Sequence, residues 1–136
     1  PLLDRIDIQC EISPVPFKDI SKAAPGEPSA RIRERVIRAR EIQAERFKDF
    51  KGIHCNAQMT ERMIHQFAEP TEEGINLLRM AMEKLSLSAR AYNRILKVAR
   101  TIADLAGSQQ IEPQHLAEAI GYRTLDRGDW AERGHF

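Results

Sequence analysis

The sequence contains no uninterrupted apolar run of about eighteen residues, the length that a helix needs to cross a membrane. It also lacks the basic-then-apolar beginning of a secretory signal. Only two cysteines occur in 136 residues, and they form no C-x-x-C pair, which excludes a disulfide framework. The sequence therefore predicts a soluble, cytoplasmic protein that makes no membrane contact and keeps its thiols reduced.

Net charge and catalytic motifs are also lacking. The 21 Lys and Arg side chains nearly cancel the 20 Asp and Glu, so any nucleic-acid site must be a local basic surface. No phosphate-binding loop G-x-x-x-x-G-K-[ST], zinc-binding H-E-x-x-H or nucleophile elbow G-x-S-x-G occurs. His54, Cys55 and His65 do not have the spacing of zinc ligands. We expect no metal site, and no enzymatic activity from this chain alone.

The chain begins with an alternating segment. Four apolar residues at every second position between 6 and 12 predict a strand with one buried face, which Pro14 ends. No other segment has comparable strand character, so the partners of this strand are expected to lie outside the sequence. The chain also starts without Met. We therefore interpret residues 1–27 as the end of a larger core, comprising a last strand and a linker, either poorly ordered or extended against a neighbour.

Helical patterns account for most of the remaining chain. Apolar residues recur at three- and four-residue steps, which predicts an all-α domain of four to five helices over residues 28–125. Only a short turn separates the third and fourth helices, which we therefore expect to pack as antiparallel neighbours. Residues 126–136 are charged and aperiodic, and they predict a flexible tail. The expected helices span residues 30–50, 56–67, 72–85, 87–106 and 113–122.

Helix 30–50 carries a local excess of positive charge. Seven basic residues and three acidic residues occur between positions 31 and 48. Such a face can bind a polyanion by releasing its counterions. A solvated or subunit-contacting face is the simpler alternative, since Glu34 and Arg38 form an i,i+4 pair that supports the helix. The residues that would contact a nucleic acid are Arg31, Arg35, Arg38 and Arg40.

Helix 87–106 has the clearest amphipathic pattern. Ser88 is a suitable N-cap and Gly107 a suitable stop. Arg90 lies in the first turn, where the helix dipole disfavours a cation, so a phosphate or an acidic side chain from another helix is expected beside it. The same helical count places the charged residues on the face opposite the core: Arg90, Arg94, Lys97 and Asp104.

Several segments stand out together: P-L-L-D-R-I-D-I (1–8), I-R-A-R (37–40), N-A-Q-M (56–59), L-S-L-S-A-R-A-Y (85–92) and R-I-L-K-V-A-R-T-I-A-D-L (94–105). In combination they resemble the C-terminal part of the magnesium-chelatase-like AAA+ ATPases of the bacterial ComM/YifB type. The resemblance covers nearly the whole chain. It implies the helical lid of such an ATPase, with the ATP- and magnesium-binding core upstream of residue 1.

The resemblance also implies roles for two arginines. Arg5 resembles the arginine finger that reaches the γ-phosphate bound to a neighbouring subunit. Arg90 resembles the sensor-2 arginine that reaches the γ-phosphate bound to its own subunit. The expected partners are the chain's own AAA+ core, the neighbouring subunits of a ring that is usually hexameric, and DNA. Without that core the chain is expected to bind neither ATP nor magnesium and to be inactive. A free-standing helical DNA-binding or assembly module is the alternative.

Overall fold

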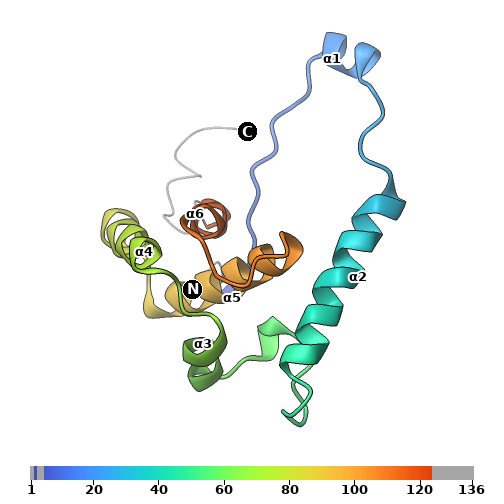
Figure 1. Ribbon diagram of the computed structural model, residues 1–136. Coiled ribbons are helices and arrows are strands. Elements are labelled where there is room, and N and C mark those ends of the chain that lie inside the picture. The colour runs from blue at the N-terminus through green and yellow to red at the C-terminus, as the bar shows by residue number, and fades with distance from the viewer. Residues whose placement is uncertain (1, 3–4, 124–136) are drawn as a thin grey trace.

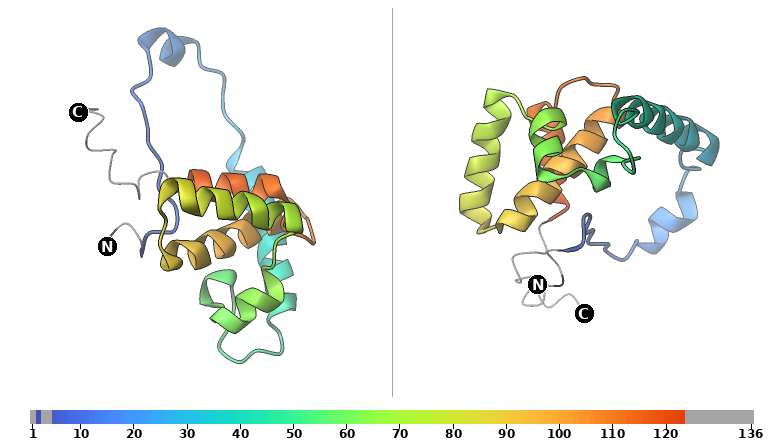
Figure 2. Two further views of the ribbon diagram at one scale, coloured as in Figure 1. Left: turned by 90° about the vertical axis from the view of Figure 1, so that its left-hand side faces the viewer. Right: turned by 90° about the horizontal axis from the view of Figure 1, so that it is seen from below.

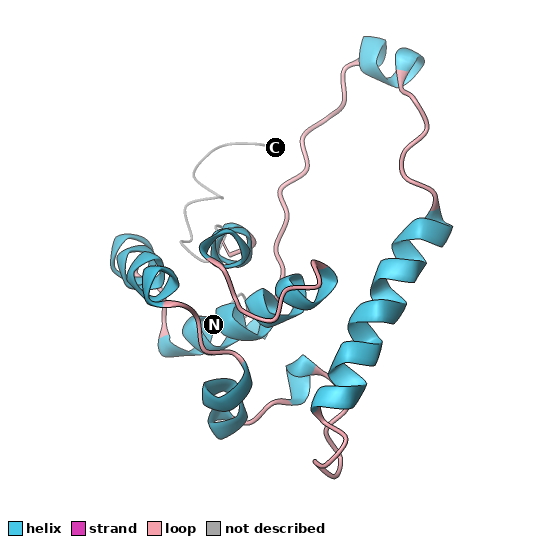
Figure 3. Ribbon diagram, viewed as in Figure 1, coloured by secondary structure: helices cyan, strands magenta, loops and turns pink. Residues whose placement is uncertain are grey.

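The computed structural model describes residue 2 and residues 5–123, and the described chain is all-α (Figures 1 and 3). No strand occurs in this part of the chain, where the only β-type pairing is an isolated bridge between Pro70 and Ile111. The elements are α1 (Phe17–Lys22), α2 (Ser29–Arg46), the 3-10 turn η2 (Asn56–Gln58), α3 (Glu61–Phe67), α4 (Glu72–Leu85), α5 (Ala89–Leu105) and α6 (Pro113–Gly121).

Helix α5 is the centre of the bundle. Helices α6, α2 and α3 and the turn η2 all pack against it, as the two views of Figure 2 show. Its buried side chains include Ile95, Leu96 and Ala99, which join α6 and the aromatic residues after α2 in one core. Removing this apolar surface from water is the main force that holds the helices together.

The signals at the two ends of α5 and at the start of α6 are confirmed. The Ser88 hydroxyl accepts a hydrogen bond from the Ala91 amide at 3.2 Å, which caps α5. Gly107 follows α5 with a φ of 71°, a conformation that favours glycine. Pro113 occupies the start of α6, and Ile111 and Leu116 on either side of it are fully buried.

Helix α4 packs chiefly on α6, so α5, which was expected to be its packing partner, is not its main contact. Gly74 explains the close approach of α4 to α6. A Cβ at this position would lie 2.7 Å from the Leu116 side chain. Only a residue without a side chain allows Leu116 to enter this space without displacement.

Two predicted helix boundaries are also wrong. Helix α2 ends at Arg46 rather than near residue 50, and Phe47 follows it as the C-cap residue. Asn56 does not cap α3, because the side chain of Thr60 accepts a hydrogen bond from the Met63 amide at 3.3 Å. Asn56 is instead buried within η2.

The predicted strand between residues 6 and 12 does not form. Ile6 and Ile8 are exposed, whereas Gln9 is buried. The backbone here bonds to the helices rather than to another strand: the Gln9 amide donates to the Tyr122 carbonyl at 2.8 Å. The short helix α1 beyond it was not expected, and it buries none of its residues.

The N-terminal half of α2 stands clear of the bundle in Figure 1. The apolar stripe of this helix, formed by Ile32, Val36, Ala39 and Phe47, is therefore only half buried. Ala39 and Phe47 lie in the core, but Ile32 and Val36 are 43% and 40% exposed.

None of the described helices combines the length and apolar character of a membrane span. The expected tail 126–136 lies outside the described residues, and the boundary near residue 28 stays a prediction.

Candidate functional site

The first turn of α5 presents Arg90 to solvent. The Ser88 cap fixes the start of the helix, and its first turn contains no acidic residue. Arg90 is exposed, and no ion pair joins it to an acid in the described chain. A cation at this end of a helix is placed where an anion is electrostatically favoured. The first turn of α5 is therefore suited to hold an anionic group.

Arg94 lies one turn further along α5 and does have an acidic partner. Its guanidinium group donates to the Asp7 carboxylate at 2.5 Å. Two residues close to Asp7 also bond to the bundle. Arg123 donates to the Ile6 carbonyl at 2.7 Å, and the Gln9 amide donates to the Tyr122 carbonyl at 2.8 Å. The segment after Arg5 is thus attached to α5 and α6.

Arg5 lies at the beginning of this attached segment. Its amide donates to the Leu2 carbonyl at 3.1 Å, and the residue is exposed. The structure therefore brings the chain that carries Arg5 to the helix that carries Arg90. It does so through Asp7 and Arg94, which the sequence did not single out as a pair.

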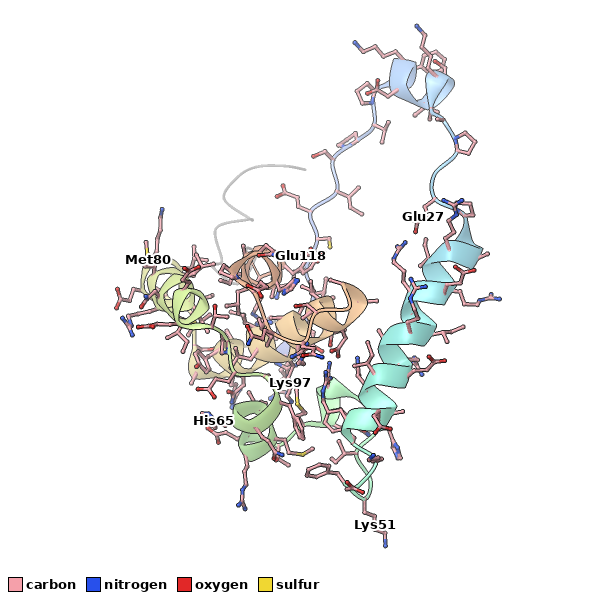
Figure 4. The ribbon with its side chains drawn as sticks, viewed as in Figure 1. Glu27, Lys51, His65, Met80, Lys97 and Glu118 are labelled. Atoms are coloured by element: carbon pink, nitrogen blue, oxygen red, sulfur yellow. The ribbon has the colours of Figure 1, made fainter. Side chains whose placement is uncertain are left out.

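The four arginines nominated as nucleic-acid contacts lie along α2, with Arg31 and Arg35 in its N-terminal half and Arg38 and Arg40 in its C-terminal half. Arg31, Arg38 and Arg40 are exposed. Arg35 is half-buried and forms an ion pair with Glu27, which Figure 4 shows beside the N-terminal end of α2. Two other basic residues of the counted excess, Arg46 and Lys48, are paired with Asp104 and Glu45.

A buried polar network joins α2, η2 and α5, and sequence reasoning missed it. Arg46 donates to both carboxylate oxygens of Asp104, at 2.8 and 2.6 Å, and to the Asn56 side chain at 2.9 Å. The Asn56 side chain donates in turn to Asp104 at 2.9 Å and to Thr101 at 3.0 Å. The backbone amide of Asn56 donates to the Gln43 side chain at 3.0 Å.

Asp104 is at the centre of this network, and its predicted place on the exposed face of α5 is wrong. The residue is 2% exposed and also lies 3.2 Å from Arg100. Burial lowers the pKa of the Arg100 guanidinium, and the Asp104 carboxylate opposes that shift. Asn56 and Asp104 lie within segments that carry the family resemblance, but no short spacing connects either of them to Arg46.

One of the described histidines has a structural role. His115 is buried and accepts a hydrogen bond from the Glu112 amide at 3.0 Å, which secures the start of α6. Cys10 and Cys55 are free and exposed. Among the described residues, no three His, Cys, Asp or Glu side chains gather in an arrangement that could hold a metal ion.

Comparison with known proteins decides the family. The model of the family described as "Magnesium chelatase, subunit ChlI C-terminal" matches residues 26–123. The chain belongs to this family. The match begins just before α2 and ends with α6, so it coincides with the helical bundle.

Two individual proteins are also similar in sequence to this magnesium chelatase C-terminal domain. The chain is 44% identical over 128 residues to the competence protein ComM of Haemophilus influenzae and 43% identical to the protein YifB of Escherichia coli. Each alignment covers 93% of this chain but only 24% of the relative. The chain therefore spans about a quarter of the length of these relatives.

Proposed function

We propose that this domain is the helical lid of an AAA+ ATPase and that Arg90 senses the γ-phosphate of ATP bound to the same subunit. The observation that carries the proposal is the exposed Arg90 in the capped first turn of α5, within the family match. Arginine offers a fixed fork of donors that suits a phosphate group. In phosphoryl transfer, such a cation stabilises the negative charge that develops on the transferred group.

Arg5 acts, in this proposal, on the ATP of a neighbouring subunit in a ring. Its support is the L-L-D-R-I sequence motif and its exposure at the edge of the bundle. In this proposal the core that binds ATP and magnesium lies outside this chain, which spans about a quarter of the length of its relatives. This domain would contribute only charge at the phosphates.

Replacing Arg90 by Ala in a longer chain that includes the ATP-binding core is expected to lower the rate of ATP hydrolysis. The expected loss is roughly ten- to a hundredfold, because a charged donor to the developing charge is removed. Arg79→Ala is the matched control, since Arg79 is an exposed arginine on α4. Steady-state phosphate release is the measurement, and unchanged turnover in Arg90→Ala would contradict the proposal.

Rings that mix two variant subunits distinguish the role of Arg5 from that of Arg90. Rings of Arg5→Ala subunits alone and of Arg90→Ala subunits alone are each expected to have strongly reduced activity. If Arg5 acts on the neighbour and Arg90 on its own subunit, a mixture contains Arg5→Ala subunits whose site is completed by an adjacent Arg90→Ala subunit. Mixing should therefore restore part of the activity. No restoration would contradict this assignment, because it would mean that the two arginines of one subunit act on the same ATP site.

A second candidate function is DNA binding through α2. The observation that favours it is the exposure of Arg31, Arg38 and Arg40 along α2. This 136-residue chain would then bind duplex DNA with an affinity that falls steeply as salt rises. Neutralising Arg38 and Arg40 should weaken binding to all sequences and lower the salt dependence by about one unit of slope per lost contact. No binding at low salt, measured by fluorescence anisotropy, would exclude this function.

A further inference from the structure

Residues 10–28, here called the strap, leave the bundle beside α6 and return to it at α2. In Figures 1 and 2 the strap arches away from the other helices, with α1 at its far point. Every residue in it is exposed. Its apolar side chains are among the most exposed of the molecule, with Ile12 at 86% and Phe17 at 82%. The strap therefore carries apolar surface that the observed conformation does not bury.

An open groove lies between α2 and α5. It has a volume of about 640 Å³, which falls in the range of occupied binding sites. Val36 and Leu105 line it with apolar surface, and each is 40% exposed. The loop before and through η2 forms another wall, which includes Cys55. Ile32 extends the apolar stripe of α2 beyond the groove.

A smaller hollow adjoins this groove, and the N-terminal segment of the chain forms part of its wall. Asp7 and Ile8 line a smaller cavity of about 280 Å³ against α5 and α6. This cavity and the larger groove share three lining residues, Ala57, Thr101 and Leu105. The strap begins two residues after Ile8, and the hydrogen bond from the Gln9 amide to the Tyr122 carbonyl anchors its start.

We propose that the strap closes into the groove between α2 and α5, and that the apolar face of α1 covers Val36 and Leu105. By helical count, Phe17, Ile20 and Ser21 share one face of α1, and Lys18 and Lys22 lie opposite. Closure removes apolar surface of both partners from water. The occupant is this chain's own segment, because it is tethered at both ends beside the groove.

The tethers are long enough for closure. Residues 23–28 can span about 20 Å when extended. Val36 lies seven residues into α2, about 10 Å from its start. Glu27 is already paired with Arg35, so the linker approaches α2 at the edge of the apolar stripe. Closing a loop whose ends are fixed costs less chain entropy than capturing a free segment.

A disulfide between the strap and the groove tests the proposal in the 136-residue chain. Cys10→Ser leaves the exposed Cys55 as the reporter in the groove. Ser21→Cys then adds a thiol on the apolar face of α1 and keeps Phe17 and Ile20. Lys22→Cys is the matched control, with the same tether but on the opposite face. Oxidised glutathione is added at low protein concentration, and monomeric disulfide is followed on non-reducing gels and by mass spectrometry.

The Ser21→Cys chain is expected to form the bond with Cys55 roughly tenfold faster than the Lys22→Cys chain, because docking raises the local concentration of one thiol at the other. Adding Phe17→Ala and Ile20→Ala should abolish that difference. Equal rates in the two cysteine variants would overturn the proposal. Disulfide-linked dimers formed in place of the monomeric bond would also overturn it, because a second copy would then fill the groove.

Discussion

Replacing Asp104 by Ala is expected to lower the free energy of unfolding by about 3–5 kcal/mol, the usual cost of removing one partner of a buried ion pair. The loss is large because Asp104 receives both hydrogen bonds of the Arg46 fork and one from Asn56. Alanine would leave Arg46 and Arg100 close together and largely buried without a counter-charge. Urea unfolding followed by circular dichroism measures the change.

Two further variants separate charge from shape at this position. Asp104→Asn keeps the size and one acceptor but loses the charge, so its unfolding free energy should lie between those of Asp104→Ala and the natural chain. Arg46→Ala combined with Asp104→Ala should cost less than the sum of the single changes, because the double variant contains no unpaired Arg46. Strict additivity would mean that the two side chains do not depend on each other.

The signals that could be read from the sequence are local ones. Ser88, Gly107 and Pro113 mark helix ends because their effects depend on the geometry of a few neighbouring residues. The exposure of Arg90 also follows from helical periodicity and the cap alone. These features were predicted correctly, and with the family resemblance they were enough to identify an all-α lid-like bundle.

The features that could not be predicted depend on contacts between distant segments. Asp104 is polar and was therefore assigned to the solvent face, but Arg46 neutralises it from another helix. The alternation between residues 6 and 12 is typical of a strand, yet a strand needs a partner to bond with, and here the backbone bonds to Tyr122 and Arg123. The packing of α4 on α6 depends on Gly74, whose missing side chain becomes significant only once Leu116 is placed.

Phe47 follows α2 at the point where the helix is fixed to the bundle, and replacing it by Ala should destabilise the protein nearly as much as Asp104→Ala. Phe47 is 2% exposed and meets Phe67 edge to face, with ring centres 5.6 Å apart. Phe50 also packs edge to face against Phe67, with ring centres 5.7 Å apart. Removing a buried phenyl ring costs about 3–5 kcal/mol, since the apolar contact is lost and a cavity remains.

Phe47→Leu is the matched control, because it keeps an apolar side chain in the space and should cost less than Phe47→Ala. Phe50→Ala should fall between the two, since Phe50 is only partly buried. In addition to urea unfolding, hydrogen exchange of single amides measures the local stability at the end of α2. The Asn56 amide bonds to Gln43 of α2, so its protection should fall in Phe47→Ala if this ring anchors the end of α2. A Phe47→Ala chain with unchanged unfolding free energy and unchanged Asn56 protection would show that the polar network around Asp104 holds α2 in place without the aromatic cluster.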